Sequence, residues 1–169
     1  MAASAFSLTY STHDLDKPIL QALDSTGAAT ANHTAGYQVT DVDGREWTYV
    51  LFDSGGTAGV AGGPAFWAQT TTNQCVTTVN TGVGITGEGF AGVFMSIPTD
   101  KYYVWIQTKG KTLARCSTIT VGCAVTVLVT EGSFEVATAG TNTIIGHTME
   151  ATTANAVSFP YINLIPFSS

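Results

Sequence analysis

The stretch GYQVTDVDGREWTYV, residues 36–50, decides the fold class of this chain. Side chains in residues 37–40 and 47–50 alternate with a period of two, which is the repeat of a β-strand. Asp43-Gly44 lies between these segments and is a favoured pair for a tight hairpin turn, because glycine accepts a positive φ without steric cost. The stretch therefore predicts an antiparallel β-hairpin.

Apolar stretches of strand length recur along the chain, with turn residues between them. No window of a dozen residues has a convincing helical period, and only residues 148–155 are compatible with a brief helical turn. We therefore expect an all-β fold, either a single β-sandwich or a partly open β-barrel domain. The further predicted strands cover residues 65–68, 75–79, 90–95, 102–107, 118–130 (with Gly122 as a break or bulge), 134–136, 143–147 and 157–164, joined by glycine-rich connections at 55–63 and 82–89 and by turns at 98–100 and 131–133.

The N-terminal residues differ from the rest of the chain. Phe6, Leu8 and Tyr10 alternate with small hydroxyl side chains, which predicts one short strand followed by a polar connection. We expect residues 1–23 to form an extended arm and residues 24–169 to form the β domain.

Length and composition indicate one folded domain. The chain has 169 residues, of which 44% are hydrophobic, so it is long enough and apolar enough to bury a core. Only 11% of its residues are charged, against roughly 25% in average soluble proteins. The surface is therefore expected to consist largely of hydroxyl, amide and small side chains.

Charge and cysteine content restrict the partners and the compartment. A net charge of −6, with six Lys and Arg in total, argues against direct nucleic-acid binding and against an anionic membrane as partner. The N-terminus lacks the pattern of a secretory signal, and no apolar run approaches the length of a membrane span. The three cysteines, Cys75, Cys116 and Cys123, have no metal-site spacing and fit small buried apolar side chains in a protein made in a reducing cytosol.

No residue pattern predicts a metal site or a phosphate site. The histidines His13, His33 and His147 have no ligand spacing. Asp41 and the Asp43-Gly44 pair resemble the beginning of a calcium loop, but the later oxygen ligands and closing Glu are absent, so a hairpin turn explains them better. Residues 82–89 are rich in glycine but contain no Lys and precede no predicted helix, unlike a phosphate-binding loop.

Catalytic residues are not recognisable either. No Ser or Cys occurs in a nucleophile-elbow pattern, and none of the loop acids forms an evident pair. We therefore expect a protein that is not an enzyme and that needs no cofactor. The loop acids are Asp14, Asp16, Asp53, Glu88 and Glu131.

Aromatic side chains leave a second possibility open. Rings in strands are more often part of a core or an interface, but exposed rings can also stack on sugars. The residues concerned are Trp47, Trp67, Trp105, Tyr102 and Tyr103.

Three stretches together carry a resemblance to a known family: residues 36–50 quoted above, YYVWIQTKGKTLARCSTITVGCAVTV at 102–127, and EGSFEVATAGTNTIIGHTMEATTANAVSFPYINLI at 131–165. The second has an aromatic-rich strand, a Lys-Gly turn, an Ala and Val stretch and a Gly before an apolar strand. The third has a Gly, a small loop, Ile-Gly, a short Ala-rich segment and a final strand. In these features the chain resembles the small decoration, or cement, proteins that coat the capsids of tailed bacteriophages.

The resemblance implies a structural protein without catalysis or cofactor. Such a protein is made in the host cytoplasm, binds the major capsid protein on the exterior of the assembled virion, often as a homotrimer, and strengthens the shell against internal DNA pressure. Many weak contacts repeated over a shell give strong binding. The alternative function is a carbohydrate- or receptor-binding β module of a fibre or lectin-like protein.

The arm supplies the candidate contact residues under this resemblance. Phe6, Leu8, Tyr10 and Leu15 are expected to be apolar anchors that add a strand to a neighbouring subunit or lie on the capsid. Alternatively, they close the sheet of their own domain.

Overall fold

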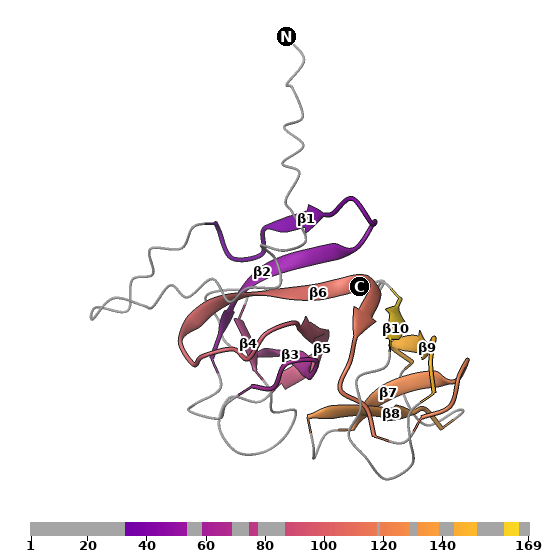
Figure 1. Ribbon diagram of the computed structural model, residues 1–169. Coiled ribbons are helices and arrows are strands. Elements are labelled where there is room, and N and C mark those ends of the chain that lie inside the picture. The colour runs from indigo at the N-terminus through magenta and orange to yellow at the C-terminus, as the bar shows by residue number, and fades with distance from the viewer. Residues whose placement is uncertain are drawn as a thin grey trace.

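The described part of the chain is built from β-strands. A computed structural model describes residues 33–53, 59–68, 75–77, 87–117, 119–128, 132–138, 144–151 and 161–165. These residues contain no helix, and so none that could span a membrane (Figure 1). The predicted all-β class is confirmed. The strands are β1 Gln38–Thr40, β2 Glu46–Phe52, β3 Pro64–Ala68, β4 Cys75–Thr77, β5 Gly87–Phe94, β6 Tyr102–Leu113, β7 Ala124–Leu128, β8 Ser133–Val136, β9 Gly146–Thr148 and β10 Tyr161–Leu164.

The strand pairings form a ring with an extension. All ten strands are hydrogen-bonded in the order β1-β2-β4-β3-β5-β6-β10-β9-β7-β8, and β2 also pairs with β6. This second pairing closes β2, β4, β3, β5 and β6 into a ring. The β2–β4 pair is parallel, and the other strand pairs are antiparallel.

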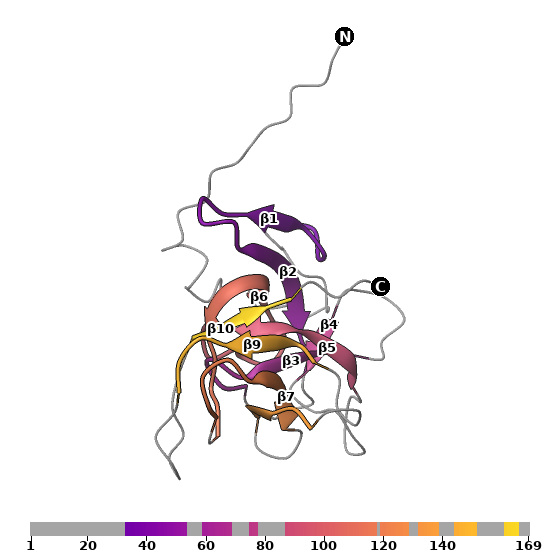
Figure 2. The same ribbon diagram turned by 90° about the vertical axis from the view of Figure 1, so that its right-hand side faces the viewer.

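Strand β6 joins the ring to the remaining strands. Its first part pairs with β2 and β5, and its last four residues pair with β10. Figures 1 and 2 show β6 running from the ring to the group formed by β7, β8, β9 and β10. The resemblance predicted a turn at residues 109–110, and this is wrong. Gly110 has a φ of +89°, which bends the strand within its length and lets it continue along a new partner.

Both faces of β2 are buried, which explains why its sequence EWTYVLF is apolar almost throughout. Val50 and Phe52 join a cluster with residues of β3, β5 and β6, inside the ring. Trp47, Tyr49 and Leu51 face the other way and pack with Val39 and with the aromatic residues of β6. A third cluster lies between β5 and the strands β7, β8 and β10.

Most strand predictions are confirmed, but residues 119–123, predicted as part of a strand, precede β7 as a turn, and two further segments need correction. Gly87 to Gly89 were predicted as loop but belong to β5, which pairs with β3. Of the helical turn suggested at 148–155, Thr148 lies in β9 and the next two residues form a bend. The arm at 1–23, with Phe6, Leu8, Tyr10 and Leu15, lies outside the described residues.

Candidate functional site

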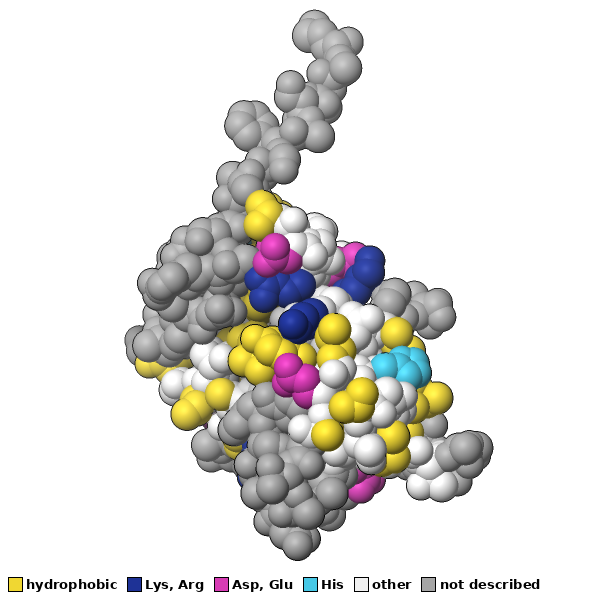
Figure 3. All heavy atoms as spheres, turned by 45° about the vertical axis from the view of Figure 1, so that its right-hand side comes forward, with side chains coloured by type: hydrophobic (Ala, Val, Ile, Leu, Met, Phe, Trp, Pro, Cys, Tyr) yellow, Lys and Arg dark blue, Asp and Glu magenta, His cyan; other side chains and the backbone are white. Residues whose placement is uncertain are grey.

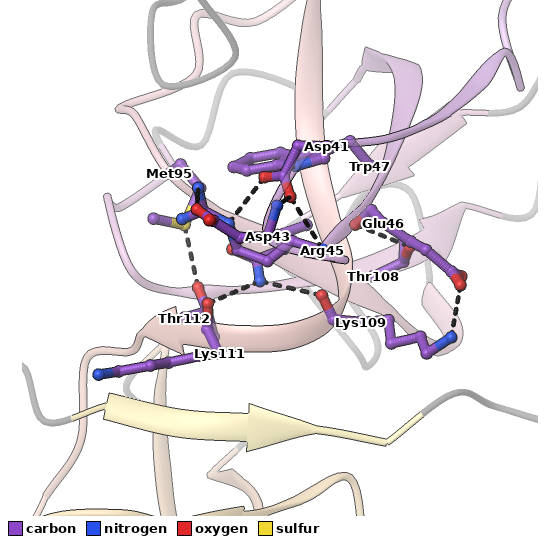
Figure 4. A network of polar contacts seen from close by, with 11 residues as sticks. Asp41, Asp43, Arg45, Glu46, Trp47, Met95, Thr108, Lys109, Lys111 and Thr112 are labelled. Carbon is purple, nitrogen blue, oxygen red and sulfur yellow. Dashed lines mark hydrogen bonds and ion pairs between the residues drawn. The ribbon is translucent and has the colours of Figure 1, made fainter. Parts of the chain in front are cut away.

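The turn of the β1–β2 hairpin is organised by a buried carboxylate. Asp41 Oδ1 accepts hydrogen bonds from the backbone N–H groups of Asp43 and Arg45, at 2.9 and 3.0 Å. Its Oδ2 accepts from Arg45 Nε at 2.7 Å and from the indole Nε1 of Trp47 at 3.1 Å (Figure 4). The Asp41 side chain has no exposed surface. All four donors belong to the hairpin, three in the turn and the Trp47 indole on β2, and the predicted hairpin is confirmed.

Electrostatics at Asp41 follow from these contacts. Burial by itself raises the pKa of Asp41, because it penalises the charged form. The hydrogen bonds from the Arg45 backbone, the Trp47 indole and the Arg45 side chain outweigh burial, together with the positive charge of Arg45, and lower the pKa below its ordinary value. Asp41 is therefore held ionised.

The tip of the hairpin presents an apolar side chain. The Asp41 N–H donates to the Arg45 carbonyl at 2.9 Å, and the Gly44 N–H donates to the Asp41 carbonyl at 3.1 Å. Three residues therefore form the loop, whereas the Asp43-Gly44 pair alone predicts two; Gly44 has the positive φ of +75° that such a loop needs. Val42 stands at the tip with 74% of its surface exposed.

Charged residues gather where the bend of β6 passes this turn. Arg45 Nη2 contacts Asp43 at 3.1 Å, and Lys109 Nζ contacts Glu46 at 2.6 Å. Figure 3 shows dark blue and magenta side chains close together on this side of the molecule. Each of these two cations is paired with a carboxylate, so the group has little net charge.

Gln107 fixes the bend itself. This side chain is fully buried, and its Nε2 donates to the carbonyl oxygens of Lys109 and Lys111, both at 3.0 Å. These carbonyls flank Gly110. Gln107 therefore holds the two sides of the bend in place.

Lys111 is positioned differently from the other cations of this group. Its Nζ lies 3.9 Å from the centre of the Tyr161 ring, a cation–π contact, and among the described residues it has no carboxylate partner. Asp43, Arg45, Lys111 and Tyr161 line an open hollow of about 300 Å³. The hairpin tip and this hollow form a surface of mixed apolar and charged character.

The described histidines do not form a metal site. His33 stacks on Tyr37 at 5.1 Å between ring centres and meets Trp105 at 5.6 Å, whereas His147 is exposed on β9. Within the described ranges, no group of three or more His, Cys, Asp or Glu could hold a metal ion. His13 lies outside these ranges.

Three of the five aromatic residues considered for sugar binding are buried. Trp47, Trp105 and Tyr103 are exposed by 0%, 1% and 7%, so their faces are covered by the protein and belong to the core. Trp67 and Tyr102 are partly exposed. For these three rings, the core position favoured by the sequence is confirmed.

Among the remaining candidates, the structure describes the side chains of Asp53, Cys116 and Cys123. Asp53 pairs with Lys101. Cys116 is buried, and burial raises its pKa to about 12, so it remains a thiol. Cys123 is partly buried. Asp14, Asp16 and Glu131 lie outside the described residues.

Sequence reasoning did not find the surface at the hairpin tip. The partners Lys111 and Tyr161 are fifty positions apart and meet only because β6 and β10 pair with Leu113 opposite Tyr161. Exposure of Val42 was the one feature that the hairpin pattern could have indicated. No protein-family model, curated protein or solved structure matches this chain, so its function is inferred from its own residues.

Proposed function

We propose that this chain is a structural virion protein that binds the outer surface of an assembled phage capsid and stabilises it against internal DNA pressure. Its partner is the major capsid protein, and it acts as a homo-oligomer, with a trimer favoured. It is synthesised in the host cytoplasm and functions on the capsid exterior.

The observation that carries this proposal is the distribution of exposed apolar side chains. Nine large apolar residues are exposed among those described, and six belong to the group formed by the end of β6 and β7 to β10 or to its connections. This enrichment favours that half of the molecule as the surface that contacts another protein. The six are Leu113, Val121, Val136, Ile144, Met149 and Ile165.

The same half of the molecule contains two of the stretches that resemble decoration proteins. Residues 102–127 and 131–165 supply β6 to β10, which are neighbours in the sheet. Two of the three stretches therefore fall on neighbouring strands, and the third, residues 36–50, supplies β1 and the first part of β2. This supports the proposal, although the matching residues are β-structure and not a catalytic motif.

The charge arrangement also suits a contact-making protein. Lys101, Lys109 and Arg45 each have a carboxylate partner within the chain. A charge that already has a partner within the chain can be covered by another protein without being left unpaired. A charge without such a partner would be left unpaired in the interface.

The carbohydrate-binding alternative has less support. It requires exposed aromatic faces, and Trp47, Trp105 and Tyr103 are buried. Of the five aromatic residues considered for sugar binding, Trp67 and Tyr102 are partly exposed.

Sedimentation with capsids tests the proposal. The purified chain should co-sediment with expanded capsids of the virus that encodes it, at a fixed ratio to the major capsid protein, and should raise their melting temperature. Absence of co-sedimentation would overturn the proposal. Binding to a glycan array in its place would favour the alternative.

A further inference from the structure

The outer edge of β1 carries unpaired backbone groups. The Asp41 N–H donates to the Arg45 carbonyl, and the Tyr49 N–H donates to the Tyr37 carbonyl. Because hydrogen-bonded positions alternate along an antiparallel pair, Val39 also faces β2 with its N–H and C=O. The N–H and C=O groups of Gln38 and Thr40 therefore point away from β2, where no described residue pairs with them.

Apart from its short length of three residues, this edge has none of the usual protections against strand pairing. Gln38 and Thr40 are exposed and uncharged, and β1 contains no proline or bulge. The sheet ends at β8 on its other side, but that edge is partly occupied: the Phe134 N–H donates to the Arg115 carbonyl and the Ser117 N–H donates to the Phe134 carbonyl. Of the two terminal strands, β1 is the better acceptor for a further strand.

The acceptor edge is also held rigid. Val39 is buried in the aromatic cluster with Trp47, and Asp41 fixes the turn that follows. Because β1 is already ordered, a strand that joins it does not bear the entropy cost of ordering β1, and binding is less costly.

We propose that residues 6–10 of a second copy of this chain add to β1 as an antiparallel strand. The side-chain pattern of this segment, Phe-Ser-Leu-Thr-Tyr, matches the edge. With Leu8 opposite Val39, the apolar side chains of the segment lie on the same face as Val39. Ser7 and Thr9 lie opposite Thr40 and Gln38, on the polar face, and exchange backbone hydrogen bonds with them.

Two observations favour a second copy as the source of this strand. Within one chain, the outward groups of Gln38 and Thr40 have no described partner. In addition, 22 residues separate Tyr10 from His33, which span up to about 70 Å when extended and so can reach another molecule. The arm itself lies outside the described residues. If each copy donates to the next, the exchange closes into a ring, such as a trimer.

The oligomeric state of full-length protein and variants tests this proposal. Wild type should be an oligomer by light scattering. Deletion of residues 2–16 removes the donor strand, and Thr40→Pro removes an outward N–H of the acceptor without touching the β1–β2 bonds. Both variants should be monomeric and still folded. Their melting temperature should be close to that of wild-type protein diluted until it is monomeric. Val136→Pro, a matched change at an outward position of β8, should leave the oligomer intact.

A crosslinking experiment decides the matter if Thr40→Pro fails to fold. Protein with Leu8→Cys and protein with Val39→Cys are mixed and mildly oxidised, with each alone and wild type as controls. A covalent dimer that forms only in the mixture supports strand exchange between copies. A monomeric wild type, or an oligomer that survives Thr40→Pro and gives no crosslink, overturns it. These results do not depend on capsid binding, so they are separable from the proposed function.

Discussion

A single carboxylate determines the geometry of the hairpin tip. Asp41 receives four hydrogen bonds from donors within six residues of it, and its side chain is shielded from water. A buried charge is tolerated only when it is compensated in this way. These contacts fix the conformation of the loop, and Val42 lies exposed to solvent at its tip.

Replacement of Asp41 should destabilise the protein more than replacement of its neighbour. In Asp41→Asn, an amide N–H₂ would face the donors Arg45 Nε and Trp47 Nε1 and leave them without an acceptor. We expect a loss of about 2 kcal/mol in the free energy of unfolding, measured by urea titration. Asp43→Asn is the matched control, because Asp43 is 65% exposed; its loss should stay below about 1 kcal/mol. Equal losses would contradict the role assigned to Asp41.

The pH dependence of stability gives an independent check on the same residue. The pKa of Asp41 is lower in the folded protein than its ordinary value of 3.8. Its contribution is therefore complete above pH 3.8 and is lost as the pH falls through the lower, folded value. The difference in stability between wild type and Asp41→Asn should accordingly shrink below pH 3.8.

At the scale of elements, the bend in β6 connects the two groups of strands. Gly110 has a left-handed φ, and a Cβ there would lie 3.1 Å from Arg45 Cγ and 3.3 Å from Arg45 Cα. Gly110→Ala should therefore cost about 2 kcal/mol in unfolding free energy, from backbone strain plus crowding against the hairpin. Gly122→Ala has a similar φ of +75° but open space around the Cβ, so it should cost only about 1 kcal/mol. An equal cost at both positions would mean that crowding by Arg45 is unimportant.

The elements were predictable where local sequence decides them. Asp43-Gly44 between alternating segments predicted the hairpin, and the structure has β1 and β2 there in antiparallel register. The course of β6 was not predictable, because Lys109-Gly110 favours a turn locally. Pairing with Asn163 and Leu164, more than fifty residues later, keeps the chain extended instead.

The candidate site was less accessible to sequence reasoning than the fold. The turn role of Asp41 followed from its position, but its saturation depends on Arg45, just before β2, and Trp47, within β2, both directing their side chains to Asp41. The contact of Lys111 with Tyr161 depends on a register that no short pattern specifies. Residues that act through long-range pairing are therefore the ones that local patterns miss.

At the scale of the whole molecule, the structure shows how the chain uses some of its few charged residues. Arg45, Lys101 and Lys109 are used in ion pairs within the chain, so these three cations are not free to direct a partner. Apolar side chains around β7 to β10 remain exposed. If the chain binds a shell, apolar contact is expected to supply most of the affinity, with avidity from repetition.

This expectation can be tested by a charge placed on the apolar surface. Val121 is 59% exposed in the turn before β7, so Val121→Asp should leave the melting temperature nearly unchanged. Capsid affinity, measured by co-sedimentation over a range of concentrations, should fall by about tenfold or more, which corresponds to about 1.4 kcal/mol per contact. Ile97→Asp is the control: Ile97 is 65% exposed but lies between β5 and β6, on the ring side. If Ile97→Asp weakens binding and Val121→Asp does not, the ring, and not the group formed by β7 to β10, faces the capsid.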